Sequence, residues 1–257
     1  MSVVVGTGQY LEYFNNPVGV RQGAIGSALA AGSIAGSLAA GYLSDRFGRR
    51  DAIWGSCFFW VVGTAIQTGV QNWQMLLAGR IINGVTVGIT SSQVPVYLAE
   101  VAKHDKRGSV IIIQQLAIDV GFTIYFFIGY ACSFIPGPAS FRATWVIQLV
   151  PCVVLMVGLL FLPESPRWLA SKDRVEEAIS VLAKIQADGN TEDPMVIAEW
   201  EEIITTLQAE REVGQGWRKF VKNGMWRRTS VGFMVQAWQQ LAGAASLSPV
   251  TFRVFLN

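Results

Sequence analysis

Five long apolar stretches dominate this sequence of 257 residues. Each has roughly the 20 residues that an α-helix needs to cross the hydrocarbon core of a bilayer. A sixth stretch begins near residue 229 and fades by about residue 247. We therefore expect an all-α fold, a multi-pass transmembrane helix bundle. Its five full spans are predicted at residues 22–43, 52–72, 75–98, 109–131 and 143–162.

The composition supports a membrane protein. Charged residues make up only 15% of the chain, and the mean hydropathy is +0.38. The 26 glycines and 9 tryptophans also fit, because glycine-rich apolar runs with aromatic ends are typical of bilayer spans. The net charge of +2 implies no acidic partner. Basic residues follow the membrane boundary instead of a groove, so no nucleic-acid partner is expected.

The loops between the spans alternate in charge. Three basic residues follow the first span, three follow the third, and ten lie in the charged stretch 163–228, so 16 of the 20 lysines and arginines share one side. The opposite loops hold only Arg21 and Arg142, while Arg80 and Arg253 belong to neither set. By the positive-inside rule, the basic side is cytoplasmic. The N-terminus is then expected outside, and residues 163–228 form a cytoplasmic helical linker.

The linker shows the pattern of short amphipathic helices. Asp173 followed by Glu176 is a capping-box pattern, and Asp193 before Pro194 is an N-cap followed by a first-turn proline. Apolar stripes at helical spacing follow both. One interpretation is a latch on the cytoplasmic face of the bundle. The other is a solvated linker with some helix.

No group of residues suggests catalysis or a bound metal. The three cysteines, Cys57, Cys132 and Cys152, are scattered at spacings unlike a metal site or a disulfide framework, so we interpret them as small buried apolar residues. His104 is the single histidine and is expected to be solvated in a charged loop. We expect neither an enzyme nor a cofactor.

Small residues recur at a spacing of four in the first and third spans. Such pairs let membrane helices approach until their backbones touch. We expect close helix packing at Gly32 and Gly36, Ser33 and Ser37, and Gly84 and Gly88.

Charged residues inside the spans indicate a partner or a watery cavity. An Arg or Asp at the centre of a membrane helix costs about 2.5–3.5 kcal/mol on insertion scales. Arg80 lies several residues inside the third span, and Asp119 lies midway along the fourth. Asp119 could contribute to a substrate site, or it could make an internal polar contact between helices.

Asp119 shares a helical face with Gln115, Phe122 and Phe126. An amide, a carboxylate and two aromatic rings suit a polyol, because its hydroxyls bind the polar groups while the rings cover its C–H faces. Gln239 and Gln240 place two more amide side chains in the sixth apolar stretch. These six residues are the predicted substrate-binding set.

A second set of charged residues lies at predicted helix ends on the cytoplasmic side. Opposite charges there could pair when this side is shut and separate when it opens, which would make an intracellular gate. The alternative is ordinary topology-setting charge, which explains the arginines but not the three acids beside them. The set is Asp45, Arg49, Arg50, Glu100, Arg107, Glu164 and Arg167.

At these residues the chain resembles the sugar porter family of the major facilitator superfamily, and most of all its fungal hexose transporters. The matching segments follow the patterns G-x-x-x-D-R-x-G-R-R, G-R-x-x-x-G, P-x-Y-x-x-E with a later R-G, Q-L-x-I-x-x-G, P-E-S-P-R-W-L and Q-Q-L-x-G. They lie at residues 41–50, 79–88, 95–108, 115–121, 163–169 and 239–243.

The resemblance implies transport of a sugar, for instance a monosaccharide such as a hexose. Gln115, Gln239 and Gln240 would hydrogen-bond sugar hydroxyls near the midplane, and residues 163–228 would join two helical halves that alternate in access. The implied location is the plasma membrane, with the lipid bilayer and the sugar as partners. Protons stay open as a coupling ion.

The resemblance covers only part of the family pattern. Members have twelve spans, and this chain matches the second to the sixth and the start of the seventh. The absent first span is where proton-coupled members carry an acid that can partner Arg80. Ala245 stands where the family has a sugar-binding Asn, and residues 246–249 break the last span.

We therefore expect a fragment truncated at both ends, with four parts. These are a transmembrane bundle at 1–162, the linker at 163–228, the start of the seventh family span at 229–247, and an atypical tail at 248–257. Two rivals remain: a non-transporting sugar sensor of the same fold, and an inactive truncated product that binds a full-length partner. A membrane enzyme is disfavoured by the lack of a catalytic constellation.

Overall fold

The computed structural model describes residues 13–14, 20–103, 106–187, 189–212 and 225–241, and their regular structure is entirely helical. This confirms the all-α expectation. The helices are α3 (Val20–Phe47), α4 (Arg49–Thr68), α5 (Trp73–Val101), α6 (Arg107–Ser133), α7 (Ala139–Ile147), α8 (Leu149–Phe161), α9 (Pro166–Ser171), α10 (Val175–Gln186), α11 (Pro194–Glu212) and α12 (Met225–Leu241).

The helices match the predicted spans closely. Helices α3 to α6 cover the first four, and α7 with α8 covers the fifth, with a break at Gln148. Within the described residues, three segments are long and apolar enough to cross a membrane: Gly23–Phe47, Arg107–Ser133 and Ala139–Phe161. Helices α4 and α5 are not among them, and both bury polar side chains inside the bundle, such as Gln67 and Asn83.

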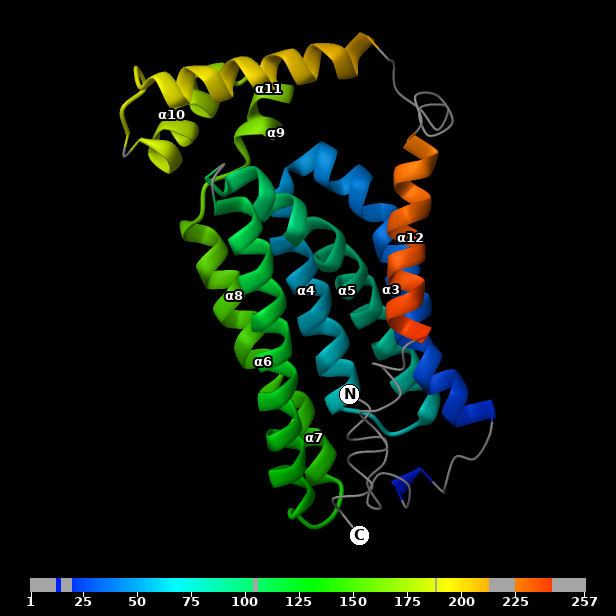
Figure 1. Ribbon diagram of the computed structural model, residues 1–257. Helices are drawn as coiled ribbons and strands as arrows, with labels where there is room; N and C mark the ends of the chain where they lie inside the picture. Colours follow the sequence, from blue (N-terminus) through cyan, green and yellow to red (C-terminus); the bar gives the residue numbers. More distant parts are fainter. Residues whose placement is uncertain (1–12, 15–19, 104–105, 188, 213–224, 242–257) are drawn as a thin grey trace.

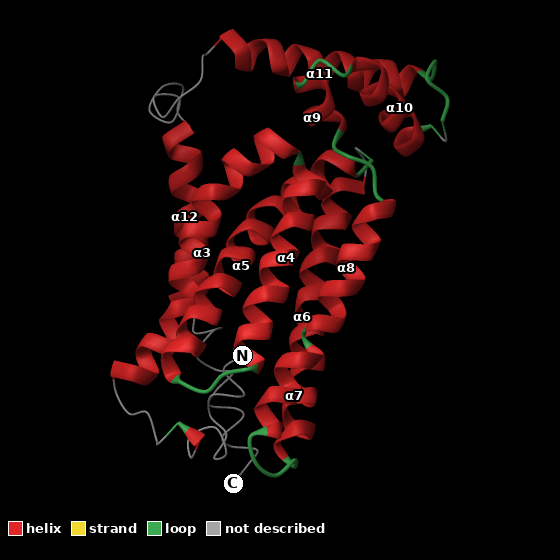
Figure 2. Ribbon diagram, turned by 180° about the vertical axis from the view of Figure 1, so that it is seen from behind, coloured by secondary structure: helices red, strands yellow, loops and turns green. Residues whose placement is uncertain are grey.

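Two layers are visible in Figures 1 and 2. Helices α3 to α8 run alongside one another, while α9, α10 and α11 lie across one end of the bundle. The outer surface of the bundle is apolar: Ile112 on α6 is 70% exposed and Leu160 on α8 is 64% exposed. A contiguous surface of this kind suits contact with lipid.

Helices α3 and α5 make the most extensive contact in the bundle. A Cβ added to Gly32 would overlap the Ile81 carbonyl, and one added to Gly84 would overlap the Leu29 carbonyl. One turn further along, a Cβ on Gly88 would overlap the backbone of Ser33. The expected close approach at small residues is therefore confirmed, because the two backbones touch.

Two apolar clusters close the bundle at opposite ends. At one end Ile25, Leu76 and Trp145 pack together with Val70 and Phe141, joining α3, α5 and α7. At the end that faces α9, the hydroxyl-bearing ring of Tyr97 packs with Ile53 and Leu159, joining α4, α5 and α8.

The linker helices have a core of their own. Trp168 and Leu169 of α9 pack against Ala178 of α10, and Leu182 of α10 packs with Val196 of α11. The start of α11 is as predicted, since Asp193 Oδ1 accepts from the Met195 N–H at 2.8 Å. Helices α9, α10 and α11 of the linker are therefore packed against one another.

The capping-box prediction at Asp173 was wrong. Helix α10 begins at Val175 after Arg174, which makes no side-chain cap bond. Asp173 has φ 59° and belongs to the turn that ends α9, where the Arg174 N–H donates to the Leu169 carbonyl at 3.0 Å. This αL turn competes with the capping geometry, since it satisfies the last carbonyls of α9 instead.

Substituting Gly84→Ala should weaken the bundle. The added methyl overlaps the α3 backbone, and overpacking of this kind costs about 1–3 kcal/mol. Unfolding of the purified chain in detergent, followed by circular dichroism, measures the loss. Gly26→Ala on α3 is the matched control, because its Cβ would meet open space and should leave stability unchanged or slightly raised. Equal stability of the two variants would contradict the contact.

Candidate functional site

The first polar centre lies where the α3–α4 turn meets the segment before α9. The backbone N–H groups of Arg49 and Arg50 donate to Glu164 Oε1 at 2.9 and 3.1 Å, and the Ser165 N–H does so at 3.0 Å. A carboxylate there satisfies N–H groups of the first turn of α4 and is favoured by the helix dipole. Gly48 makes the turn with φ 103°, a conformation that favours glycine.

Arg49 links this centre to the end of α5. Its Nε lies 3.2 Å from Glu100 Oε2, which also accepts from Ser165 Oγ at 2.6 Å. The Arg49 and Glu100 side chains are only 16% and 12% exposed, so water screens this ion pair weakly. Asp45 lies 3.5 Å from Arg49 but is 81% exposed, and such surface contacts contribute about 0–1 kcal/mol. We call Asp45, Arg49, Glu100, Glu164 and Ser165 the rim cluster.

Three members or neighbours of the rim cluster were missed from the sequence. Ser165 joins the two acids, Tyr97 donates its hydroxyl to the Pro163 carbonyl at 2.7 Å, and Trp168 Nε1 donates to the Asp45 carbonyl at 3.2 Å. The signal was present, because all three belong to the segments 95–108 and 163–169 that had already been singled out.

The side chains of two predicted gate arginines bind outside the rim cluster. Arg50 pairs with the neighbouring Asp51 at 2.9 Å and donates to the Leu162 carbonyl at 3.2 Å. Arg107 reaches across to the linker, where its Nη2 lies 2.9 Å from Glu199 Oε1 of α11. Arg167 is half-buried on α9. The structure thus brings five of the seven predicted gate residues together, Arg50 through its backbone N–H alone.

A second connection joins the linker to the bundle beside Arg107. Lys103, just beyond α5, donates to the Gln186 carbonyl at the end of α10 at 3.0 Å. The Gln186 amide in turn hydrogen-bonds Glu199. A cation at a helix C-terminus is favourable, so this contact suits the latch interpretation of the linker.

The predicted substrate face lies on the open side of α6. Gln115, Asp119 and Phe122 are exposed, Phe122 by 70%, and Phe126 is half-buried. Asp119 accepts through its backbone carbonyl from Thr123 Oγ1 of the same helix at 3.0 Å. Gln239 and Gln240 lie on α12, and their side chains are outside what is described.

Arg80 is buried where α3, α4 and α5 meet. It is 4% exposed, and its Nη1 donates to the Ile25 carbonyl of α3 at 2.9 Å. Asn83, one turn further along α5, is fully buried and donates to Thr64 Oγ1 of α4 at 3.2 Å. A buried cation in a membrane bundle marks a functional site by default.

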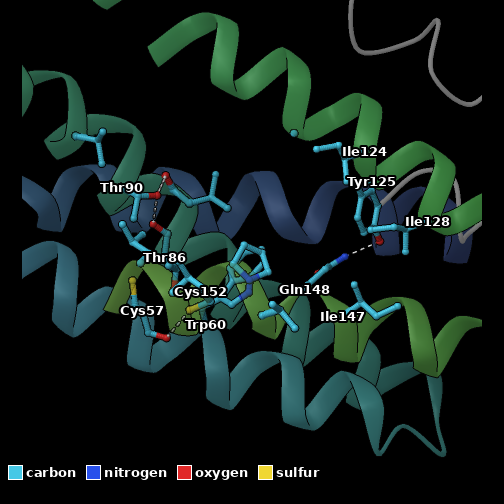
Figure 3. A pocket seen from close by; sticks show the side chains of 17 residues that line it. Cys57, Trp60, Thr86, Thr90, Ile124, Tyr125, Ile128, Ile147, Gln148 and Cys152 are labelled. Carbon is cyan, nitrogen blue, oxygen red and sulfur yellow. Dashed lines mark hydrogen bonds between the residues drawn. The ribbon is translucent and has the colours of Figure 1, made fainter. Parts of the chain in front are cut away.

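A cavity of about 950 Å³ opens between α4, α5, α6 and α8 (Figure 3). Its walls are mostly apolar, with Trp60 among them. The polar exceptions include Gln148, whose Nε2 donates to the Tyr125 hydroxyl at 2.5 Å. The four predicted substrate residues on α6 do not line the cavity, because they occupy a different face of that helix from Gly121, Ile124 and Tyr125.

Comparison with known proteins gives one consistent match. The family model described as Sugar (and other) transporter matches residues 7–255. A high-affinity glucose transporter of Kluyveromyces lactis is 39% identical over 95% of this chain and 44% of its own length. An MFS glucose transporter of Aspergillus flavus is 42% identical over 95% of this chain and 48% of its own length. The chain spans about half the length of these relatives.

Solved structures of sugar transporters are similar to this chain as well. The proton:xylose symporter XylE bound to 6-bromo-6-deoxy-D-glucose is similar with a TM-score of 0.71 and 26% identity, over 83% of this chain and 50% of that one. A partially occluded inward-open XylE from E. coli gives a TM-score of 0.70 with 25% identity, over 82% of this chain and 56% of that one.

Proposed function

The chain belongs to the Sugar (and other) transporter family, and from this premise we propose that it is part of a transporter that moves a monosaccharide across a membrane by alternating access. The observation that carries the proposal is the match over 95% of the chain to two glucose transporters. A hexose is therefore the proposed substrate, and the plasma membrane the proposed location, with residues 163–228 in the cytoplasm.

The proposed sugar site uses the exposed face of α6. The Gln115 amide can both donate to and accept from sugar hydroxyls, the Asp119 carboxylate can accept, and Phe122 and Phe126 can cover C–H faces. Gln239 and Gln240 are proposed to complete the site from α12. The exposure of Gln115, Asp119 and Phe122 on α6 supports this assignment, since a substrate needs access to the groups that bind it.

In the complete transporter, Gln115→Ala should lower sugar uptake by about 2- to 10-fold at low sugar concentration, the expected loss for one hydrogen bond. Uptake of labelled glucose, normalised to protein in the membrane, measures it. Gln114→Ala is the matched control, because Gln114 lies next to Gln115 but on a half-buried face of α6. Unchanged uptake kinetics in Gln115→Ala would remove Gln115 from the site.

The rim cluster is proposed to work as the intracellular gate. Arg49 ties α4 to Glu100 on α5, and Glu164 ties α4 to the linker. These contacts support a gate whose charges pair when the cytoplasmic side is shut and separate when it opens. Arg50 and Arg107 would act at its edge, through their contacts with Leu162 and Glu199. Arg167 would act there from α9.

Arg49→Glu should lower uptake about tenfold or more at normal surface level. The new carboxylate would face the acids Asp45 and Glu100, whereas Arg49 pairs with Glu100. The charge swap Arg49→Glu with Glu100→Arg should restore part of the loss. Arg174→Glu is the control, since its pair with Glu177 is exposed and should matter little. Normal uptake in Arg49→Glu would discard the gate.

Protons are the proposed coupling ion. The similarity to a proton:xylose symporter and the buried cation Arg80 support this. Uptake that is insensitive to a protonophore would count against it.

We propose that the chain is a fragment with the four parts given above: 1–162, 163–228, 229–247 and 248–257. An antibody against 163–228 tests this in native membranes. A band at about twice the 28.1 kDa of this chain is expected, and a single band at 28.1 kDa would show a short product instead.

A further inference from the structure

Two cysteines lie close together on the neighbouring helices α4 and α8. Cys57 on α4 is 2% exposed and Cys152 on α8 is 9% exposed, and both are free thiols. Cys152 Sγ lies 3.7 Å from the Cys57 carbonyl. Neither takes part in the proposed sugar site or the rim cluster.

Both thiols line the 950 Å³ cavity (Figure 3). Apolar groups surround them there, among them Trp60 and Leu155. A small ligand that enters the cavity therefore meets two sulfur atoms and few other polar groups. The third cysteine, Cys132, lies near the far end of α6 and does not line the cavity.

The ligand set decides which ion could bind. Thiolates select soft ions, and zinc in structural sites takes four protein ligands. Among the described residues no group of three or more His, Cys, Asp or Glu is close enough to hold a metal. An ion that binds here must therefore be stable with two sulfur ligands.

The charge of the two thiolates further limits which ions could bind. Two thiolates carry two negative charges, so a divalent ion gives a neutral product, whereas a monovalent ion would leave a net charge in an apolar cavity. Burying an unpaired charge is costly. We propose that Cys57 and Cys152 form a two-thiol site for a soft, thiophilic divalent cation, represented by Hg(II).

Binding changes no oxidation state. Each thiol releases its proton to water, each sulfur forms one bond to the ion, and one ion displaces two protons. The product joins α4 to α8 through a sulfur–metal–sulfur bridge. Because one chain supplies both sulfurs, the second bond forms at a high effective concentration.

The test uses the purified chain in detergent with Hg(II), and a small monothiol as competitor. The charge-transfer absorbance of the sulfur–mercury bonds reports binding. The chain and the control Cys132→Ser should each retain one bridged ion. In Cys57→Ser and in Cys152→Ser only one sulfur remains. The monothiol should therefore remove the bound Hg(II) from either variant at about 100-fold lower concentration.

Circular dichroism keeps loss of fold apart from loss of the site. Where a serine variant loses helicity, the alanine variant at the same position replaces it in the comparison. Equal retention by the chain and by either single variant would overturn the proposal. So would two ions per chain bound one at each thiol, or loss of the bridge in Cys132→Ser.

Discussion

Contact between the backbones of α3 and α5 is the constraint on which the rest of the structure depends. Lipid tails are as apolar as leucine, so membrane helices associate through close packing and polar contacts instead of the hydrophobic effect. Gly32 and Gly84 meet with no room for a methyl group. This approach fixes α3 beside α5, and it brings the turn at Gly48 near the end of α5, where Arg49 reaches Glu100.

The polar contacts of the bundle differ in what they contribute. The Arg49–Glu100 pair is mostly shielded from water, while Arg174–Glu177 is about half exposed and so contributes little. Glu164 combines three backbone hydrogen bonds with the dipole of α4. Shielded charge thus gathers where bundle and linker meet, which is where a gate needs contacts that hold firmly and then separate together.

The sequence predicted what depends on local periodicity and missed part of what depends on distant pairing. Span positions follow from hydrophobic length, and the α3–α5 contact follows from glycine spacing. The substrate face of α6 followed from the helical period, but its separation from the cavity depends on how α6 is rotated against α5 and α8. Arg107 and Glu199 are 92 residues apart, so no local pattern could pair them. At Asp173 a local pattern existed, and the αL turn after α9 overrode it.

The most direct test is glucose uptake by cells that lack their own hexose transport. One culture produces the complete protein from which we propose this chain derives, and another produces the 257 residues alone. The complete protein should give saturable uptake of labelled glucose that unlabelled glucose competes for, and the short chain should give none. A complete protein that reaches the cell surface and takes up no sugar would contradict the account, as would full uptake by the short chain.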